Sequence, residues 1–162
     1  MNLLTTRAKY YSTHNPILIK AVLSTRGTVL ELGSGPFSTP LLHWLCAEKK
    51  RPLYTFESNP EYFSFSKAFQ SGNHHVRHIA DWNDLGIKEL CSVALIDQHK
   101  DRGATALQLK DKVELIILHD SEAEELYGYD KIWGEFKYRY DWKASYPWTT
   151  VVSNFIDITN GI

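Results

Sequence analysis

Hydrophobic and polar residues follow two alternating patterns along the 162-residue chain. Short, almost wholly apolar runs are typical of strands that are covered on both faces, whereas apolar residues three and four positions apart are typical of helices. The first pattern predicts strands over residues 28–32, 52–58, 75–79, 91–97 and 113–120. The second predicts helices over residues 16–25, 38–50, 59–70 and 104–111. Asn15-Pro16 and Asn59-Pro60 each predict a helix start at which the asparagine is the N-cap and proline takes the first helical position. Strands and helices are therefore expected to alternate through about residue 120.

The tail of the chain follows a different pattern. Residues 136–142 and 149–157 alternate apolar and polar positions, and a segment that contains Pro147 separates them. Such alternation is typical of antiparallel strands. The tail therefore predicts a C-terminal antiparallel β-hairpin that completes one edge of the sheet.

Together these patterns predict a single α/β domain over residues 1–162. Strands that alternate with helices are typical of a doubly wound parallel sheet. We therefore expect a doubly wound, mostly parallel sheet with helices on both faces, in three α/β/α layers. Within it we expect an N-terminal helical segment over residues 1–26, a βαβ core over residues 27–122 and the hairpin segment over residues 123–162.

Composition and charge narrow the classes of partner. The chain carries 18 Lys and Arg residues against 19 Asp and Glu residues, and proteins that bind the nucleic-acid backbone usually carry a basic excess, so nucleic acid is disfavoured as a main partner. Cys46 and Cys91 lie in apolar runs without metal-ligand spacing, which indicates a reducing compartment. The first residues are too polar for a signal peptide, and no apolar run approaches membrane length. We therefore expect a cytoplasmic protein that makes no membrane contact.

The stretch VLELGSGPFST at residues 29–39 is the clearest candidate for a cofactor site. In open α/β sheets, ligands bind beyond the carboxyl ends of the strands, near the point where the strand order reverses. Ser38 stands where a dinucleotide fingerprint requires its third glycine, and no lysine follows as in a P-loop. Glu31, two residues before Gly33, would repel a pyrophosphate but attract an ammonium or sulfonium group. The alternative is that Glu31 is an exposed acid at the end of a strand.

Glu57, at the end of the second predicted strand, is the next candidate. It lies 22 residues after Gly35, close to the spacing of about 20 residues at which an acid reaches ribose hydroxyls. The alternative is an acid that favours the N-terminus of the next helix, which begins at Asn59 and Pro60. A turn and an acid in this register favour a nucleoside ligand.

Four segments, taken in order, resemble the successive motifs of class I S-adenosylmethionine (SAM)-dependent methyltransferases. They are ELGSGPFST, YTFESNPE, ADW and ALID, and the resemblance spans about residues 28–122. It implies the Rossmann-like fold and SAM as the cofactor. It also implies cofactor-binding roles for Glu31, Gly33, Ser34, Gly35, Glu57, Ser58, Asp81, Trp82 and Asp97.

The resemblance assigns parts of the cofactor to these residues. The turn at residues 33–35, together with Glu31, would face the methionine part, and Glu57 would hold the ribose hydroxyls. Asp81 would accept a hydrogen bond from the adenine amino group, and Trp82 would pack near the ring. The alternative for Asp81 and Trp82 is a turn at a strand end with a tryptophan in the core.

The loop after the fourth predicted strand resembles the catechol-type O-methyltransferase branch of this family. Asp97 and Lys100 match its Asp-x-x-Lys segment, in which the aspartate binds magnesium and the lysine deprotonates a substrate hydroxyl. Asp120 matches a further acidic ligand, but Ser121 stands where that branch has an asparagine. A Mg2+ site at Asp97 and Asp120 is therefore one alternative, since Mg2+ takes oxygen ligands and keeps several waters.

Without a metal, other residues become the candidates for chemistry. Asp97 would then line the cofactor pocket or cap the following helix. His99 and His119 become candidate bases because imidazole titrates near neutral pH, although either side chain could equally be a hydrogen-bonded structural residue. The candidate catalytic residues are therefore Lys100, His99 and His119.

The acceptor of the methyl group is the least defined part of the prediction. The loop after the fourth predicted strand lacks the Asn/Asp-Pro-Pro-aromatic motif associated with methylation of nucleobase amino groups. A chain of 162 residues has little room for a substrate domain, so acceptor recognition must come from Tyr10, Tyr11 and His14, from the late loops, or from another subunit of a homo-oligomer. We expect transfer to an oxygen or nitrogen of a small molecule. The alternatives are a non-catalytic module or partner subunit that binds SAM or S-adenosylhomocysteine (SAH), and an NAD-dependent oxidoreductase.

Overall fold

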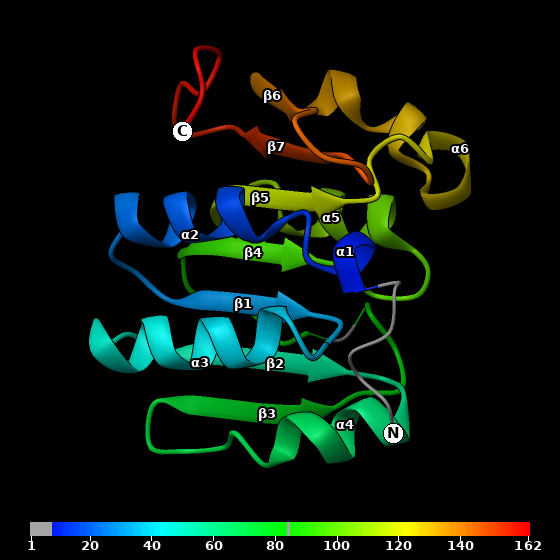
Figure 1. The fold of residues 1–162 in the computed structure, drawn as a ribbon. Helices are drawn as coiled ribbons and strands as arrows, with labels where there is room; N and C mark the ends of the chain where they lie inside the picture. Colours follow the sequence, from blue (N-terminus) through cyan, green and yellow to red (C-terminus); the bar gives the residue numbers. More distant parts are fainter. Residues whose placement is uncertain (1–7, 84) are drawn as a thin grey trace.

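The computed structural model describes residues 8–83 and 85–162, so residues 1–7 of the expected N-terminal segment lie outside the described residues. Within the described residues, one seven-stranded sheet has the order β3-β2-β1-β4-β5-β7-β6 (Figure 1). Strands β1 to β5 are parallel, and β7 is antiparallel to both β5 and β6. The strands are β1 (Val29–Leu32), β2 (Leu53–Glu57), β3 (His74–His78), β4 (Cys91–Ile96), β5 (Val113–His119), β6 (Tyr138–Trp142) and β7 (Thr149–Ser153).

Helices cover both faces of this sheet, which confirms the predicted three-layer α/β/α fold. Helices α2, α3 and α4 lie in front of the sheet in Figure 1, and α5 lies behind it. The helices are α1 (Ala8–Tyr11), α2 (Asn15–Ser24), α3 (Ser38–Glu48), α4 (Pro60–Lys67), α5 (Arg102–Leu109) and α6 (Glu124–Tyr127), with short 3-10 helices η1 (Tyr129–Lys131) and η2 (Trp133–Glu135). None of the helices in the described part of the chain is long and apolar enough to cross a bilayer.

Two apolar cores hold the layers together. On one face, Ile17 of α2 and Leu42 of α3 pack against sheet residues such as Val29. On the other face, Ala106 of α5 and the buried ring of Tyr129 pack against residues of the central strands. Because β1, β4 and β5 are buried on both faces, their sequences are almost wholly apolar, and this explains why the sequence pattern located them.

The start of α2 differs by one residue from the prediction. Asn15 is the first helical residue rather than the cap, and His14 precedes it with a helical backbone. The backbone N–H of Asn15 donates to the Ser12 carbonyl oxygen, so the turn before the helix is already closed. The other predicted cap is confirmed, since the Asn59 side chain accepts from the backbone N–H groups of Glu61 and Tyr62.

The strand order reverses between β1 and β4, as expected for the ligand end of such a sheet. Here the turn after β1 approaches the loop after β4 very closely. A Cβ atom on Gly33 would lie 2.5 Å from the Gln98 backbone nitrogen, and Gly33 also has a φ of +89°. Only glycine fits this position without strain, so the turn and the loop can form one wall of a site.

Candidate functional site

A cavity of about 640 Å³ lies at the carboxyl ends of β1, β2, β4 and β5. This volume falls within the range of about 300–1,000 Å³ that is typical of small-molecule sites. Its wall comes from segments far apart in the sequence, namely the N-terminal residues Tyr10, Tyr11 and His14, residues 33–38, 57–59 and 97–99, and Arg102, His119, Asp120, Tyr127 and Pro147. The fold therefore brings the candidate cofactor turn and the candidate bases to one cavity.

The carboxylate of Glu57 organises one end of this cavity. Its Oε2 accepts hydrogen bonds from the Ser34 backbone N–H at 2.7 Å and from the Ser34 hydroxyl at 3.1 Å. Its Oε1 accepts from the backbone N–H groups of Ser58 and Asn59, each at 2.7 Å. The Ser34 hydroxyl also lies 3.2 Å from the Tyr62 carbonyl oxygen, so it has a second acceptor within reach. Glu57 thus ties the turn after β1 to the end of β2.

Glu31 lies behind the turn rather than in the cavity wall. Its side chain is fully buried, and the Thr39 hydroxyl donates to its two oxygens at 2.9 and 3.1 Å. Thr39 in turn accepts from the Gly35 backbone N–H at 3.0 Å. Burial raises the pKa of Glu31 to about 7, against the opposing hydrogen bonds from Ser38, Thr55 and Thr39. Glu31 is therefore one hydrogen-bonded residue away from the candidate cofactor turn, and its pKa lies near neutral pH.

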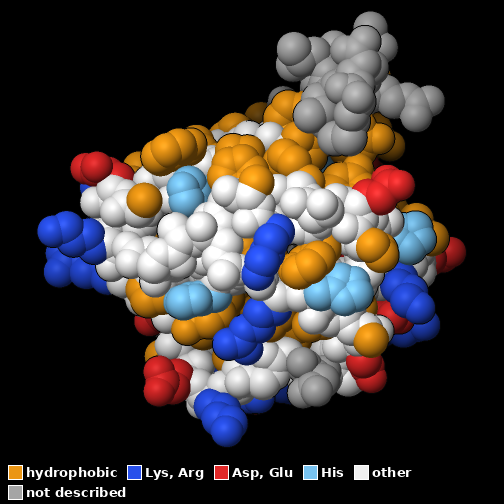
Figure 2. All heavy atoms as spheres, turned by 90° about the horizontal axis from the view of Figure 1, so that it is seen from below, with side chains coloured by type: hydrophobic (Ala, Val, Ile, Leu, Met, Phe, Trp, Pro, Cys, Tyr) orange, Lys and Arg blue, Asp and Glu red, His pale blue; other side chains and the backbone are white. Residues whose placement is uncertain are grey.

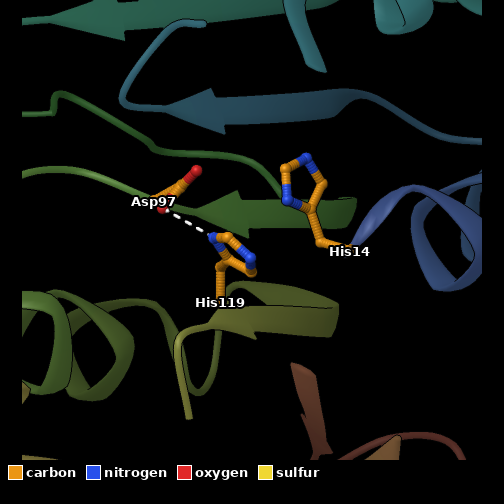
Figure 3. A group of neighbouring side chains, drawn as sticks. All are labelled: His14, Asp97 and His119. Atoms are coloured by element: carbon orange, nitrogen blue, oxygen red, sulfur yellow. Dashed lines mark hydrogen bonds and ion pairs between the residues drawn. The ribbon is translucent and has the colours of Figure 1, made fainter. Parts of the chain in front are cut away.

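His119 and Asp97 form a hydrogen-bonded pair at the other end of the cavity (Figure 3). His119 Nδ1 lies 3.1 Å from Asp97 Oδ1, and His119 Nε2 lies 2.9 Å from the Thr13 hydroxyl. Burial alone would raise the pKa of Asp97, but the hydrogen bond and charge of His119 outweigh it and lower this pKa to about 2. Burial alone would lower the pKa of His119, but the Asp97 carboxylate outweighs it and raises this pKa. A hydroxyl, an imidazole and a carboxylate in this order are the arrangement of a general base.

Arg102 holds this pair in place. Its guanidinium lies 3.0 Å from Asp97 Oδ1 and 2.9 Å from Asp120 Oδ2, and it donates to the His119 carbonyl oxygen at 3.0 Å. Its Cζ atom lies 3.9 Å from the centre of the Tyr127 ring. The side chain is almost fully buried, so these contacts fix the guanidinium between the two carboxylates.

His14 is the unusual member of the group in Figure 3. Its side chain is buried, and neither ring nitrogen has a hydrogen-bond partner among the described residues. Its ring lies edge-on to the His119 ring, with the centres 4.6 Å apart. Burial, followed by the charge of His119, lowers the pKa of His14 to about 3, so the imidazole is neutral at pH 7. Buried polar atoms without partners call for an explanation, and a ligand of the cavity would supply one.

The geometry also bears on a metal site. His14, Asp97 and His119 each offer one ligand atom, and these atoms lie within 4.8 Å of one another. However, both nitrogens of His119 are already engaged, and Arg102 pairs with both Asp97 and Asp120. A guanidinium thus occupies the place where a cation would balance the two acids. The described residues therefore do not fit the oxygen shell that Mg2+ prefers.

The structure brings most of the predicted site residues together and leaves some apart. The cavity wall includes Gly33, Ser34, Gly35, Glu57, Ser58, Asp97, His99, His119 and Asp120. It does not include Lys100, Asp81 or Trp82. Asp81 is exposed and accepts from Asn83 in the loop after β3, while Trp82 packs into one of the apolar cores. Among the described residues, Asp81 therefore makes the contacts of a turn residue, and Trp82 makes those of a core tryptophan.

Sequence reasoning did not single out Arg102 or Thr13 as site residues. Arg102 begins α5, and only the sheet order reveals that its side chain faces the end of β5 as well as the end of β4. Thr13 is separated by 106 positions from its partner His119. No local pattern carries such long-range pairs, although the two acids that follow β4 and β5 did suggest a cation between them, and the structure places Arg102 there.

Comparison with known proteins adds evidence about the fold. Neither a protein-family model nor a curated sequence relative matches the chain. Solved structures do match, and among them is the SAH-bound methyltransferase PaMTH1 of Podospora anserina, with a TM-score of 0.67 and 12% identity over 85% of this chain and 77% of that chain. The fold is that of the class I methyltransferases.

Two further solved structures agree. Human methyltransferase-like protein 13, in complex with SAH, gives a TM-score of 0.62 and 13% identity over 90% of this chain and 82% of that chain. The methyltransferase domain of METTL16 gives a TM-score of 0.58 and 10% identity over 87% of this chain and 83% of that chain. At such identities the likeness establishes the class I methyltransferase fold, and the chemistry has to be argued from the cavity.

Proposed function

We propose that this chain binds SAM in the cavity and transfers its methyl group to an oxygen or nitrogen of a small acceptor molecule. One observation carries the proposal. The cavity has a glycine turn and the Glu57 carboxylate at one end, and the hydrogen-bonded Asp97 and His119 at the other. A nucleoside site and a base that open into the same small-molecule cavity are what methyl transfer requires.

At the cofactor end, Glu57 would accept the ribose hydroxyls. Its four lone-pair positions already receive three backbone N–H groups and the Ser34 hydroxyl. The Ser34 hydroxyl can turn to the Tyr62 carbonyl oxygen instead, which frees one position on the carboxylate. Glu57 and Ser34 would therefore bind the ribose together, with Ser58 beside them in the wall.

At the chemical end, His119 would remove the proton from the acceptor. When Nδ1–H donates to Asp97, Nε2 carries a lone pair, and this lone pair now accepts from the Thr13 hydroxyl. The acceptor hydroxyl or amine would take the place of Thr13 at Nε2. The hydrogen bond with His119, together with the guanidinium of Arg102, keeps Asp97 ionised, and Asp97 keeps the imidazole in the required tautomer.

Recognition of the acceptor would fall to His14 and the aromatic wall. His14 presents two unpaired nitrogens next to His119, so it can donate or accept a second hydrogen bond. Tyr10, Tyr11 and Tyr127 in the wall can cover an organic acceptor and exclude water. The cavity volume favours a small molecule over a macromolecule as the acceptor.

Titration calorimetry with SAH, beside NAD, tests the proposal. We expect SAH to bind and NAD not to bind, because the turn lacks the features that hold a pyrophosphate. Binding of NAD without SAH would overturn the proposal in favour of an oxidoreductase. A His119→Gln variant that binds SAH and keeps full transfer to its acceptor would exclude His119 as the base.

A further inference from the structure

Glu31 is a buried carboxyl group to which the proposed methyl transfer gives no direct role. It lies in the middle of the sheet on β1, between Thr55 of β2 and Leu95 of β4. Its side chain is fully buried and does not reach the cavity. An acid in such a position is costly unless it has a proton or several donors. The hydrogen bonds around it show how a proton could reach it.

A chain of hydrogen bonds leads from Glu31 to the surface. The Thr55 hydroxyl lies 2.6 Å from Glu31 Oε2 and 2.8 Å from His74 Nε2. His74 Nδ1 lies 3.2 Å from His43 Nδ1, and His43 is partly exposed on α3. His74 belongs to β3, the edge strand, and Figure 2 shows histidine side chains at the surface of this side of the molecule. Every gap between Glu31 and His43 is therefore short enough for a proton to pass.

The chain can run in two directions. With Glu31 ionised, Thr55 donates to it, His74 Nε2–H donates to Thr55, and His43 donates to His74. With Glu31 protonated, each of these bonds reverses, because a hydroxyl and a neutral imidazole can each donate on one side and accept on the other. Moving a proton in or out requires only this reversal, with no change of backbone.

Glu31 is also connected inward, to the cofactor turn. Thr39 donates to Glu31 and accepts from the backbone N–H of Gly35, which lies in the cavity wall. Only the Thr39 side chain therefore separates the Glu31 carboxylate from the backbone of the turn. A negative charge at this position attracts a cationic ligand more than a neutral one.

We propose that Glu31 exchanges a proton with solvent through Thr55, His74 and His43, and that its ionised form favours cationic SAM over neutral SAH. This inference rests on the proposed function. Binding of SAM releases the Glu31 proton to solvent at His43. After methyl transfer removes the sulfonium charge, a proton from solvent returns to Glu31, and the weakened attraction favours release of the product.

The groups that face Glu31 are consistent with this role. The negative charge of Glu57 on β2 raises the pKa of Glu31 further. Burial raises the pKa of Cys46 on α3 to about 11, so this thiol is neutral at pH 7, and Leu95 on β4 is apolar. Burial lowers the pKa of His74 on β3 to about 4, so His74 is neutral at pH 7 and can relay the proton without keeping it. No described cation is paired with Glu31, so the cofactor would supply the missing positive charge.

Calorimetry in buffers of different ionisation enthalpy measures the proton directly. At pH 7, where Glu31 is about half ionised, we expect SAM to release about half a proton more than SAH. The SAM affinity should rise by up to about tenfold per pH unit below pH 7 and level off above it. In Glu31→Gln, both effects should vanish while SAH still binds. Glu48→Gln is the matched control. Glu48 is an exposed acid at the C-terminal end of α3, whereas Thr39, which contacts Glu31, lies at the N-terminal end, so this variant should behave as the wild type.

Infrared difference spectra provide a second readout that needs no acceptor. The carbonyl band of a protonated carboxylic acid should disappear when SAM binds and persist when SAH binds, and Glu31→Gln should lack it. A proton difference that persists in Glu31→Gln would belong to the ligand's own amino group and would overturn the inference. Equal proton release by SAM and SAH would overturn it while leaving the proposed function intact, whereas a protein that binds neither would overturn both.

Discussion

Replacing Glu57 by glutamine tests the proposed cofactor end of the cavity most directly. Each oxygen of the Glu57 carboxylate accepts two hydrogen bonds, from Ser34 on one side and from Ser58 and Asn59 on the other. Glutamine has an amide NH2 in place of one oxygen, so one pair of donors loses its acceptor. Because Glu57 is almost fully buried, we expect the free energy of unfolding to fall by about 1–3 kcal/mol.

The Glu57→Gln change should also weaken binding of the proposed cofactor. Loss of a charge-assisted hydrogen bond to ribose costs about 1.5–3 kcal/mol, or an affinity for SAH that is about 10- to 150-fold lower. At this chain length the loss of stability corresponds to a melting temperature lower by about 2–12 °C. Thermal unfolding and calorimetry with SAH measure the two effects on the same sample.

A matched control separates the ribose contact from general damage. Glu61→Gln changes an exposed acid in the first turn of α4, four residues away, and should alter neither quantity. If Glu57→Gln folds and binds SAH as tightly as the wild type, the assignment of Glu57 to the ribose is refuted. If it loses stability without losing affinity, Glu57 serves the turn alone.

Three further variants probe buried ionisable side chains. Folding raises the pKa of Glu31 from 4.5 to about 7, so between these pH values the folded state binds more protons than the unfolded state. The free energy of unfolding should therefore fall by about 3 kcal/mol from about pH 4.5 to about pH 7. In urea unfolding of Glu31→Gln, this pH-dependent fall should be absent. Arg102→Met should lower the free energy of unfolding by about 3 kcal/mol, because it removes the guanidinium that contacts both Asp97 and Asp120 and leaves only His119 beside these two acids; no loss in urea unfolding would contradict the pairing. His14→Leu should raise the melting temperature, since about 1–3 kcal/mol of unpaired polar burial is removed, and it should abolish transfer; a stable variant with full transfer would exclude His14 from acceptor binding.

Much of the fold could be predicted because its signals are local. The central strands are covered on both faces, so their sequences are apolar throughout and stand out from the helices. Element ends were harder to predict, since they depend on contacts with other elements. For example, the predicted strand over residues 149–157 ends at Ser153, whose hydroxyl binds the Glu114 carbonyl oxygen on β5 and the backbone N–H groups of two following residues.

The candidate site could be predicted only in part. Gly33 and Asp97 each follow a strand and Glu57 ends one, and parallel strands bring their carboxyl ends to one edge of the sheet, so the sequence was enough to expect them together. The position of Glu31 depends on which way its side chain leaves β1, and the structure turns it toward Thr39 and Thr55, away from the cavity. The alternative that Glu31 is an exposed acid was therefore wrong, and its link to the turn runs through Thr39.

The sequence by itself determined the order of strands and helices, the glycine turn and the acids at the strand ends, because hydrophobic periodicity and backbone freedom are properties of short segments. Only the tertiary structure decided which further side chains join the site and how they contact one another. It placed His14 against His119, put Arg102 between two carboxylates, and linked Glu31 to the surface through His74. These contacts join residues far apart in the chain, and the energies of burial and charge that govern them exist only once the chain has folded.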